Sequence, residues 1–153
     1  MKFFTRAWCS GEYSDEKSDS LVADYYRHLD EIAPKLSPDL LTVAYNVSLH
    51  DAQFKAIYLD QAEHQLTIRL RCGELQTGYF DLLLRYDSVL CDTDMELESL
   101  VERKGVEVLY AEMDIADDSQ FEHRIILWPE GEITIRFTQF EFSRTAVHSR
   151  NAP

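Results

Sequence analysis

The hydrophobic pattern of this chain changes period at residues 49–52, Leu-His-Asp-Ala. Before these residues, apolar side chains recur at spacings of three and four, which indicates amphipathic helices. After them, apolar and polar residues alternate almost to the C-terminus, which indicates half-buried antiparallel strands. The 153 residues are enough for one domain with its own core. We therefore predict a single domain, 1–153, that is helical over 14–47 and forms a sheet over 50–144.

Two helices are expected before the change of period. The first covers 14–33, because Ser14 suits an N-cap and Pro34 cannot continue a helix. The second is shorter and covers about 38–46, with Ser37 as its cap and a proline at its first position. A third, short helix is expected near 93–104. Its start would be a capping box of Thr93 and Glu96, and its end would be Gly105.

Six strands are expected after the change, over residues 52–59, 65–72, 79–87, 106–115, 121–128 and 132–142. In the last strand the apolar residues slip by one position, between Phe137 and Phe140. Such a slip indicates either a β-bulge or a strand end that turns onto a new neighbour. Cys91 is expected in a loop, and the tail from about Thr145 is expected to fray.

Consecutive antiparallel strands with helices gathered at one end of the chain predict an α+β fold. We expect the N-terminal helices to pack on a mainly antiparallel sheet of about six strands. Six aromatic residues are candidates either for the core or for an exposed apolar patch on an uncovered sheet face, Tyr79, Tyr86, Tyr110, Trp128, Phe140 and Phe142.

The chain carries 28 acidic and 15 basic residues, a formal net charge of −13. This charge disfavours binding to nucleic acid, because it repels phosphates. Its simplest role is solubility, and its sharper role is to attract a basic protein partner. We expect a cytoplasmic protein without membrane contact, since no long apolar run or signal-peptide pattern occurs. The three cysteines have no metal-binding spacing and are expected to be inert thiols.

His50 and Asp51 are the first candidates for chemistry, with His50 as a general base or metal ligand. Adjacent residues of an extended chain point to opposite faces, so these two share a site only if a turn or bulge reorients one. We favour a structural role, in which Asp51 caps backbone donors at the strand entry and His50 hydrogen-bonds a carbonyl of the helical layer.

A metal site assembled from His50, Asp51, Glu112, Asp114 and His123 is an alternative. Glu112 and Asp114 lie two apart on one strand and should share a face. No spacing forces the five to converge, however, and we predict neither a metal nor a cofactor. No nucleophile motif or nucleotide-binding loop occurs, so no catalytic residue is assigned. The candidate binding residues are His50, Asp51, Tyr110, Glu112 and His123.

Several segments of this chain resemble a family of uncharacterised bacterial proteins with a domain of unknown function. These are the N-terminal Met-Lys-Phe-Phe-Thr-Arg-Ala-Trp, the helix from Tyr25, the Ser-Leu-His-Asp-Ala block at 48–52 and the segment 108–112. The resemblance implies a bacterial origin and a shared fold, and it implies no activity. Similar small bacterial domains occur as immunity proteins beside toxins, which is an analogy of fold and context.

Three hypotheses of function follow. The leading one is a non-enzymatic protein-binding module, whose sharpest form is an immunity-type inhibitor of a basic toxin. The second is a metal- or small-ligand-binding enzyme centred on His50 and Asp51. The third is a structural homodimer, joined through an open sheet face or edge.

Overall fold

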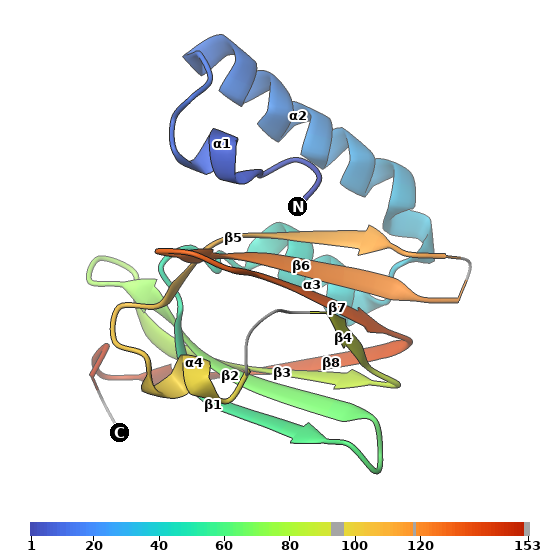
Figure 1. Ribbon diagram of the computed structural model, residues 1–153, viewed down its shortest axis with the longest axis vertical. Helices are drawn as coiled ribbons and strands as arrows, with labels where there is room; N and C mark the ends of the chain where they lie inside the picture. The colour runs from blue at the N-terminus through green and yellow to red at the C-terminus, as the bar shows by residue number, and fades with distance from the viewer. Residues whose placement is uncertain (93–96, 118, 152–153) are drawn as a thin grey trace.

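One antiparallel sheet of eight strands bends over on itself to form two layers (Figure 1). The computed structural model describes residues 1–92, 97–117 and 119–151, with the backbone alone described at 91 and 92. The strand order is β4-β7-β6-β5-β1-β2-β3-β8. The strands are β1 (Gln53–Asp60), β2 (Gln65–Glu74), β3 (Gly78–Asp87), β4 (Leu90–Asp92), β5 (Glu107–Ile115), β6 (Phe121–Trp128), β7 (Glu132–Phe137) and β8 (Gln139–Val147).

The predicted α+β class with an antiparallel sheet is confirmed, although the sheet has eight strands instead of about six. One layer holds β4, β7, β6 and β5, and the other holds β1, β2, β3 and β8. The layers join where Gln53 of β1 pairs with Glu107 of β5. The short strand β4 includes Cys91, for which a loop was predicted, because it pairs with β7.

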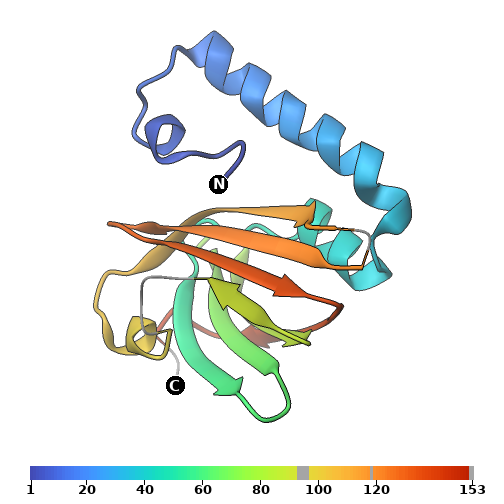
Figure 2. The same ribbon diagram turned by 45° about the vertical axis from the view of Figure 1, so that its right-hand side comes forward.

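The helices are α1 (Arg6–Cys9), α2 (Asp15–Ile32), η1 (Ala33–Lys35), α3 (Pro38–Asn46) and α4 (Ser99–Glu102). The predicted caps of α2 and α3 form, since Ser14 Oγ accepts from the Lys17 N–H at 3.4 Å and Ser37 Oγ from the Leu40 N–H at 3.3 Å. Helix α2 lies outside the layer that contains β5 and β6 (Figure 2). Within the described ranges, no helix combines the length and apolar character needed to cross a membrane.

The short helix predicted near 93–104 is present as α4, which has a single turn. Gly105 has the left-handed φ of 79° that was expected at the end of this helix. The proposed capping box of Thr93 and Glu96 lies outside the described residues.

The phase slip near the C-terminus marks a change of neighbour. Strand β7 ends at Phe137 and pairs with β6, whereas β8 begins at Gln139 and pairs with β3. Between them, the N–H of Thr138 donates to the carbonyl of Asp87 at 3.0 Å. Of the two predicted explanations, the turn onto a new neighbour is therefore the correct one. A single residue carries the chain from one layer to the other.

The predicted fraying of the tail from Thr145 is wrong. Strand β8 pairs with β3 as far as Val147. Beyond it, the buried guanidinium of Arg71 donates to the carbonyls of Ser149 and Arg150, each at 2.9 Å. Arg150 in turn donates to the carbonyl of Asp51 at 3.1 Å and to Glu107 at 2.6 Å. The tail is therefore held in place from both sides, because Arg71 donates to its carbonyls and its own Arg150 donates to the body of the domain.

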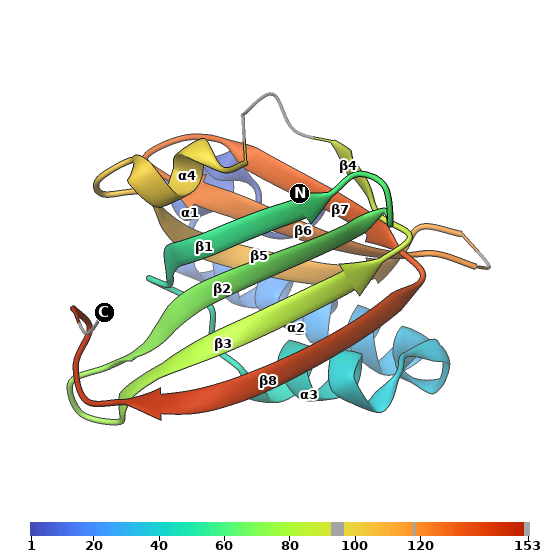
Figure 3. The same cartoon turned by 90° about the horizontal axis from the view of Figure 1, so that it is seen from below.

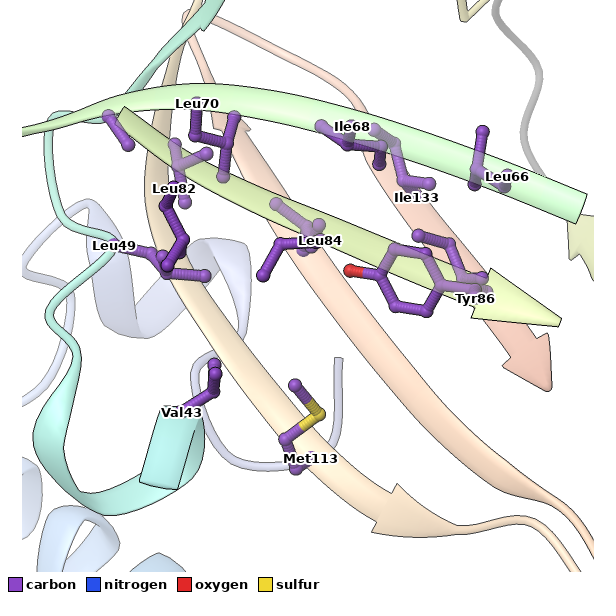
Figure 4. Close-up of a cluster of buried hydrophobic side chains, with 14 of the residues drawn as sticks. Val43, Leu49, Leu66, Ile68, Leu70, Leu82, Leu84, Tyr86, Met113 and Ile133 are labelled. Atoms are coloured by element: carbon purple, nitrogen blue, oxygen red, sulfur yellow. The ribbon is translucent and has the colours of Figure 1, made fainter. Parts of the chain in front are cut away.

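The core lies between the two layers, as the alternating pattern requires (Figure 4). Its fully buried members from β2, β3 and β7 are Leu66, Ile68, Leu70, Leu82, Leu84, Tyr86, Ile133, Ile135 and Phe137. Figure 3 shows the outer face of β1, β2, β3 and β8, with α3 beside β8 and no described helix across that face. Tyr58 and Leu83 are 66% and 40% exposed there, while Trp128 is 57% exposed elsewhere.

Candidate functional site

A cavity of about 440 Å³ lies among the N-terminal segment, α2, α3 and β5. Three of the predicted site residues, His50, Tyr110 and His123, line it. Its apolar lining includes Val43 and Met113, which Figure 4 shows on α3 and β5 at the side of the core. The sequence predicted these residues individually, and the fold brings them to one place.

The cavity exists because β5 has a partly free edge. Strand β5 pairs with β1 at a single position, and backbone hydrogen bonds of Val108 with Asp51 and Ala52 extend that contact by one residue. From Tyr110 onward, no described strand lies beside this edge, and α3 lies near it instead. Tyr110 and Met113 both line the cavity although they stand on opposite faces of β5, so the cavity wraps around the edge.

One wall of the cavity is aromatic. Trp8 meets Tyr110 edge-on, with ring centroids 4.6 Å apart. Phe4 lies 4.9 Å from both Trp8 and Tyr25, and His50 lies 5.1 Å from Tyr110. Such offset and edge-on pairs are the favoured arrangement of aromatic rings. Phe4 and Trp8 were not among the predicted site residues, although three aromatic residues within the first eight, Phe3, Phe4 and Trp8, were a signal.

Glu112, a predicted binding residue, anchors this wall from behind and does not line the cavity. Its side chain is fully buried, and it accepts the backbone N–H groups of Lys2, Phe3 and Phe4 at 2.8, 2.6 and 2.6 Å. The guanidinium of Arg124 lies 3.5 Å away and balances its charge. Because backbone amides donate to it, Glu112 fixes the path of the segment that carries Phe4 and Trp8.

His50 and Asp51 lie together in a turn. Asp51 has a left-handed φ of 60°, and this brings its Oδ1 to 3.5 Å from His50 Nε2. The condition stated for a shared site, a turn that reorients one of the two side chains, is therefore met, because the chain is not yet extended here. His50 Nδ1 donates to the carbonyl of Leu109 at 2.7 Å, so a carbonyl partner was correctly predicted, but it belongs to β5 and not to the helices.

His123 forms the floor of the cavity. It has no exposed surface, and burial lowers its pKa to about 3, so the imidazole is neutral near pH 7. Its Nδ1 lies 2.8 Å from the hydroxyl of Tyr86, which does not line the cavity. Its Nε2 and the Nε1 of Trp8 are buried and have no hydrogen-bond partner among the described residues.

The alternative considered for these residues, a shared metal site, does not form among the described residues. Among the residues that the structure describes, no three His, Cys, Asp or Glu side chains are grouped so as to hold a metal ion. Glu112 and Asp114 do share a face, as predicted, and both contact Arg124 there. His123 instead faces the core on the other side of the layer, where it meets Tyr86.

Asp114 belongs to an ion-pair network beneath α2. It bonds His28 Nε2 at 2.7 Å and Arg124 at 3.1 Å. Burial alone would raise the pKa of Asp114, but the bonds from His28 and from the Ile115 N–H outweigh it, and the pKa lies below its ordinary value. This carboxylate therefore stabilises the contact between α2 and the sheet.

The described lining of the cavity contains no aspartate, glutamate, lysine or arginine. Its polar groups are histidine, tyrosine, tryptophan, serine and asparagine side chains, which suits recognition of a neutral molecule. Comparison with protein-family models, with curated proteins and with solved structures finds no match to this chain.

Proposed function

We propose that this protein is a non-enzymatic binding protein for a small, mostly apolar molecule held in the cavity. The observation that carries the proposal is that two residues of the cavity lining, Trp8 and His123, each have a buried ring nitrogen with no hydrogen-bond partner among the described residues. Buried polar atoms normally have hydrogen-bond partners, and a ligand group supplies one. The volume of 440 Å³ also lies within the range of about 300–1,000 Å³ that is usual for small-molecule sites.

The geometry favours binding over catalysis. His50 and Asp51 are exposed at the rim, and Nδ1 of His50 is already bonded to a carbonyl. Glu112 is occupied by three backbone amides behind the wall. The second hypothesis, an enzyme centred on His50 and Asp51, would thus depend on an exposed pair alone. Its discriminating test is Asp51→Asn, which removes the carboxylate of the pair outside the cavity lining and should leave ligand-induced thermal shifts intact if the cavity only binds.

The proposal is tested with N-phenyl-1-naphthylamine, a neutral probe whose fluorescence rises in apolar sites. We expect saturable binding with one probe per chain. Ala44→Phe places a ring in the cavity lining and should abolish this binding, whereas Ala23→Phe makes the same change on an exposed position of α2 and should not. Thermal melting of both variants establishes that they are folded. Equal binding by the two variants, or no saturable binding by the wild type, would refute the proposal.

One observation supports the leading hypothesis from the sequence, that the protein is a module that binds a basic protein. The solvent side of α2 and the residues before it carry six exposed carboxylates, Glu12, Asp15, Glu16, Asp19, Asp30 and Glu31. Such a face would attract a basic partner, for example a basic toxin if the chain is an immunity-type inhibitor.

Titration with a co-encoded basic protein tests this second candidate. Its affinity should fall with rising salt and should weaken about tenfold or more in a double variant, Glu16→Lys with Asp19→Lys. Salt-independent affinity would exclude the electrostatic form. The homodimer hypothesis stays a prediction, and sedimentation that shows only monomer would remove it.

A further inference from the structure

We infer that the ligand of the cavity is a neutral molecule with an aromatic ring system and a hydrogen-bonding group that reaches Nε2 of His123. This inference rests on the proposed binding function and narrows it to a chemical class. It depends on three features, namely the composition of the wall, the absence of charge from the described lining, and the floor residue.

The aromatic wall of the cavity favours a ligand that contains aromatic rings. Phe4, Trp8, Tyr25 and Tyr110 form a continuous series of tilted and edge-on contacts with centroids 4.6 to 5.4 Å apart. His50 extends the series to the rim of the cavity. A planar aromatic ligand can stack on or meet these rings edge-on, and such contacts contribute beyond the area that they bury. A saturated ligand of the same size gains the burial without these contacts.

The described lining selects against charge. An anionic ligand group would enter a site whose described residues offer no positively charged side chain, so it would lose its hydration without compensation. The two tyrosines of the wall add no charge either, because burial raises the pKa of both Tyr25 and Tyr110. The net charge of −13 acts from outside and further disfavours anions. A neutral ligand avoids both costs.

His123, at the floor of the cavity, favours a ligand with one hydrogen-bonding group. His123 is neutral and its Nδ1 is engaged with the Tyr86 hydroxyl, so Nε2 is the atom left for a ligand. If the Tyr86 hydroxyl donates to Nδ1, then Nε2 carries the proton and donates. If Nδ1 donates to Tyr86, then Nε2 accepts. A ligand hydroxyl satisfies either tautomer, because it both donates and accepts.

Four matched probes test the inference by displacement of N-phenyl-1-naphthylamine. They are 2-naphthol, naphthalene, the saturated analogue decahydro-2-naphthol, and the anion 2-naphthoate. We expect 2-naphthol to displace the fluorescent probe at the lowest concentration. Naphthalene should need about three- to tenfold more, which is the usual worth of one hydrogen bond. The saturated and the anionic analogues should each need at least tenfold more.

His123→Phe keeps a ring at the floor and removes both nitrogens. In this variant 2-naphthol and naphthalene should displace the probe about equally. If the variant does not fold, imidazole ¹⁵N spectra of the wild type replace it, and 2-naphthol but not naphthalene should shift the Nε2 resonance of His123.

The outcomes separate the inference from the function on which it rests. If the probe binds and all four competitors displace it equally, the ligand class is wrong and the binding function stands. If His123→Phe keeps the preference for 2-naphthol, or the spectra do not change, the role of His123 is wrong. If the fluorescent probe itself never binds saturably, the proposed function fails.

Discussion

At the scale of single residues, Glu112 and His123 are both buried polar side chains, but only Glu112 has partners that would offset a charge. Three backbone amides and Arg124 surround the buried carboxyl group of Glu112 with hydrogen-bond donors and a positive charge. His123 has no such partners for a positive charge, and burial therefore keeps it neutral. The first fixes the wall of the cavity and the second forms its floor, so each makes a separate prediction.

Replacing Glu112 by glutamine should destabilise the protein by about 2–4 kcal/mol. The amide has one acceptor oxygen in place of a charged carboxylate, so the bonds from Lys2, Phe3 and Phe4 weaken or break. Urea unfolding followed by circular dichroism measures the change. Glu141→Gln, at an exposed position of β8, is the matched control and should stay within about 0.5 kcal/mol of the wild type. Equal effects would show that Glu112 anchors nothing.

His123 should make the folded state sensitive to mild acid. Its pKa is about 3 in the folded protein against an ordinary value of 6.5, so below pH 6.5 the unfolded chain binds a proton that the folded chain does not. The free energy of unfolding should therefore fall as the pH falls from 6.5 towards 3, by at most about 1.4 kcal/mol per pH unit.

Unfolding in urea at pH 7, 5.5 and 4 measures this slope. His123→Phe should flatten it, while His148→Gln, at an exposed position, should keep the wild-type slope. Parallel pH profiles for wild type and His123→Phe would contradict a neutral, buried His123.

At the scale of elements, the β2–β3 hairpin depends on close approach of its two strands. Gly73 has a φ of 95°, and a Cβ atom there would lie 2.1 Å from the carbonyl oxygen of Gly78. Gly105, which follows α4, has a similar φ of 79° but open space around its Cα. A residue with a side chain would therefore meet left-handed backbone strain at both positions, but only at position 73 would its Cβ atom also clash with a neighbour.

Alanine at Gly105 should cost about 1–2 kcal/mol, the usual cost of a left-handed L-residue. Alanine at Gly73 should cost about 3–5 kcal/mol, because the clash with Gly78 is added to that strain. Thermal and urea unfolding of the two variants measure both values. Equal losses would mean that the hairpin adjusts to admit the extra methyl group.

At the scale of the whole molecule, the last strand and the tail connect parts that are distant in sequence. Arg71 on β2 is 2% exposed and joins Asp81 on β3 to the carbonyls of Ser149 and Arg150. A buried charge that loses its partner is costly, so this arginine should contribute more to stability than a surface one.

Arg71→Met should destabilise the protein by about 2–4 kcal/mol and increase amide hydrogen exchange in residues 147–151, with little change in β5. Arg85→Met is the control, because Arg85 is exposed and its nearest carboxylate, on Asp87, is 3.9 Å away. It should cost less than about 1 kcal/mol. Unchanged exchange in the tail of Arg71→Met would show that other contacts hold it.

The sequence predicted what depends on near neighbours. The caps at Ser14 and Ser37 and the phase slip after Phe137 are local signals, and each has a structural counterpart. The cavity was not predicted, because it arises where β5 and β1 stop pairing beyond Glu107 and Gln53, which are far apart in the chain. The tail was likewise misjudged, since its partner Arg71 lies in another strand.

The partly free edge of β5 has a consequence for solubility. An uncovered strand edge presents unpaired backbone groups that can recruit a strand of another molecule, and such pairing leads to aggregation. Here α3 and the aromatic N-terminal segment lie near this edge. Any change that loosens them, including Glu112→Gln, would expose a template for intermolecular strand pairing. The N-terminal segment and α3, which enclose the cavity, therefore also reduce the tendency of the folded protein to self-associate.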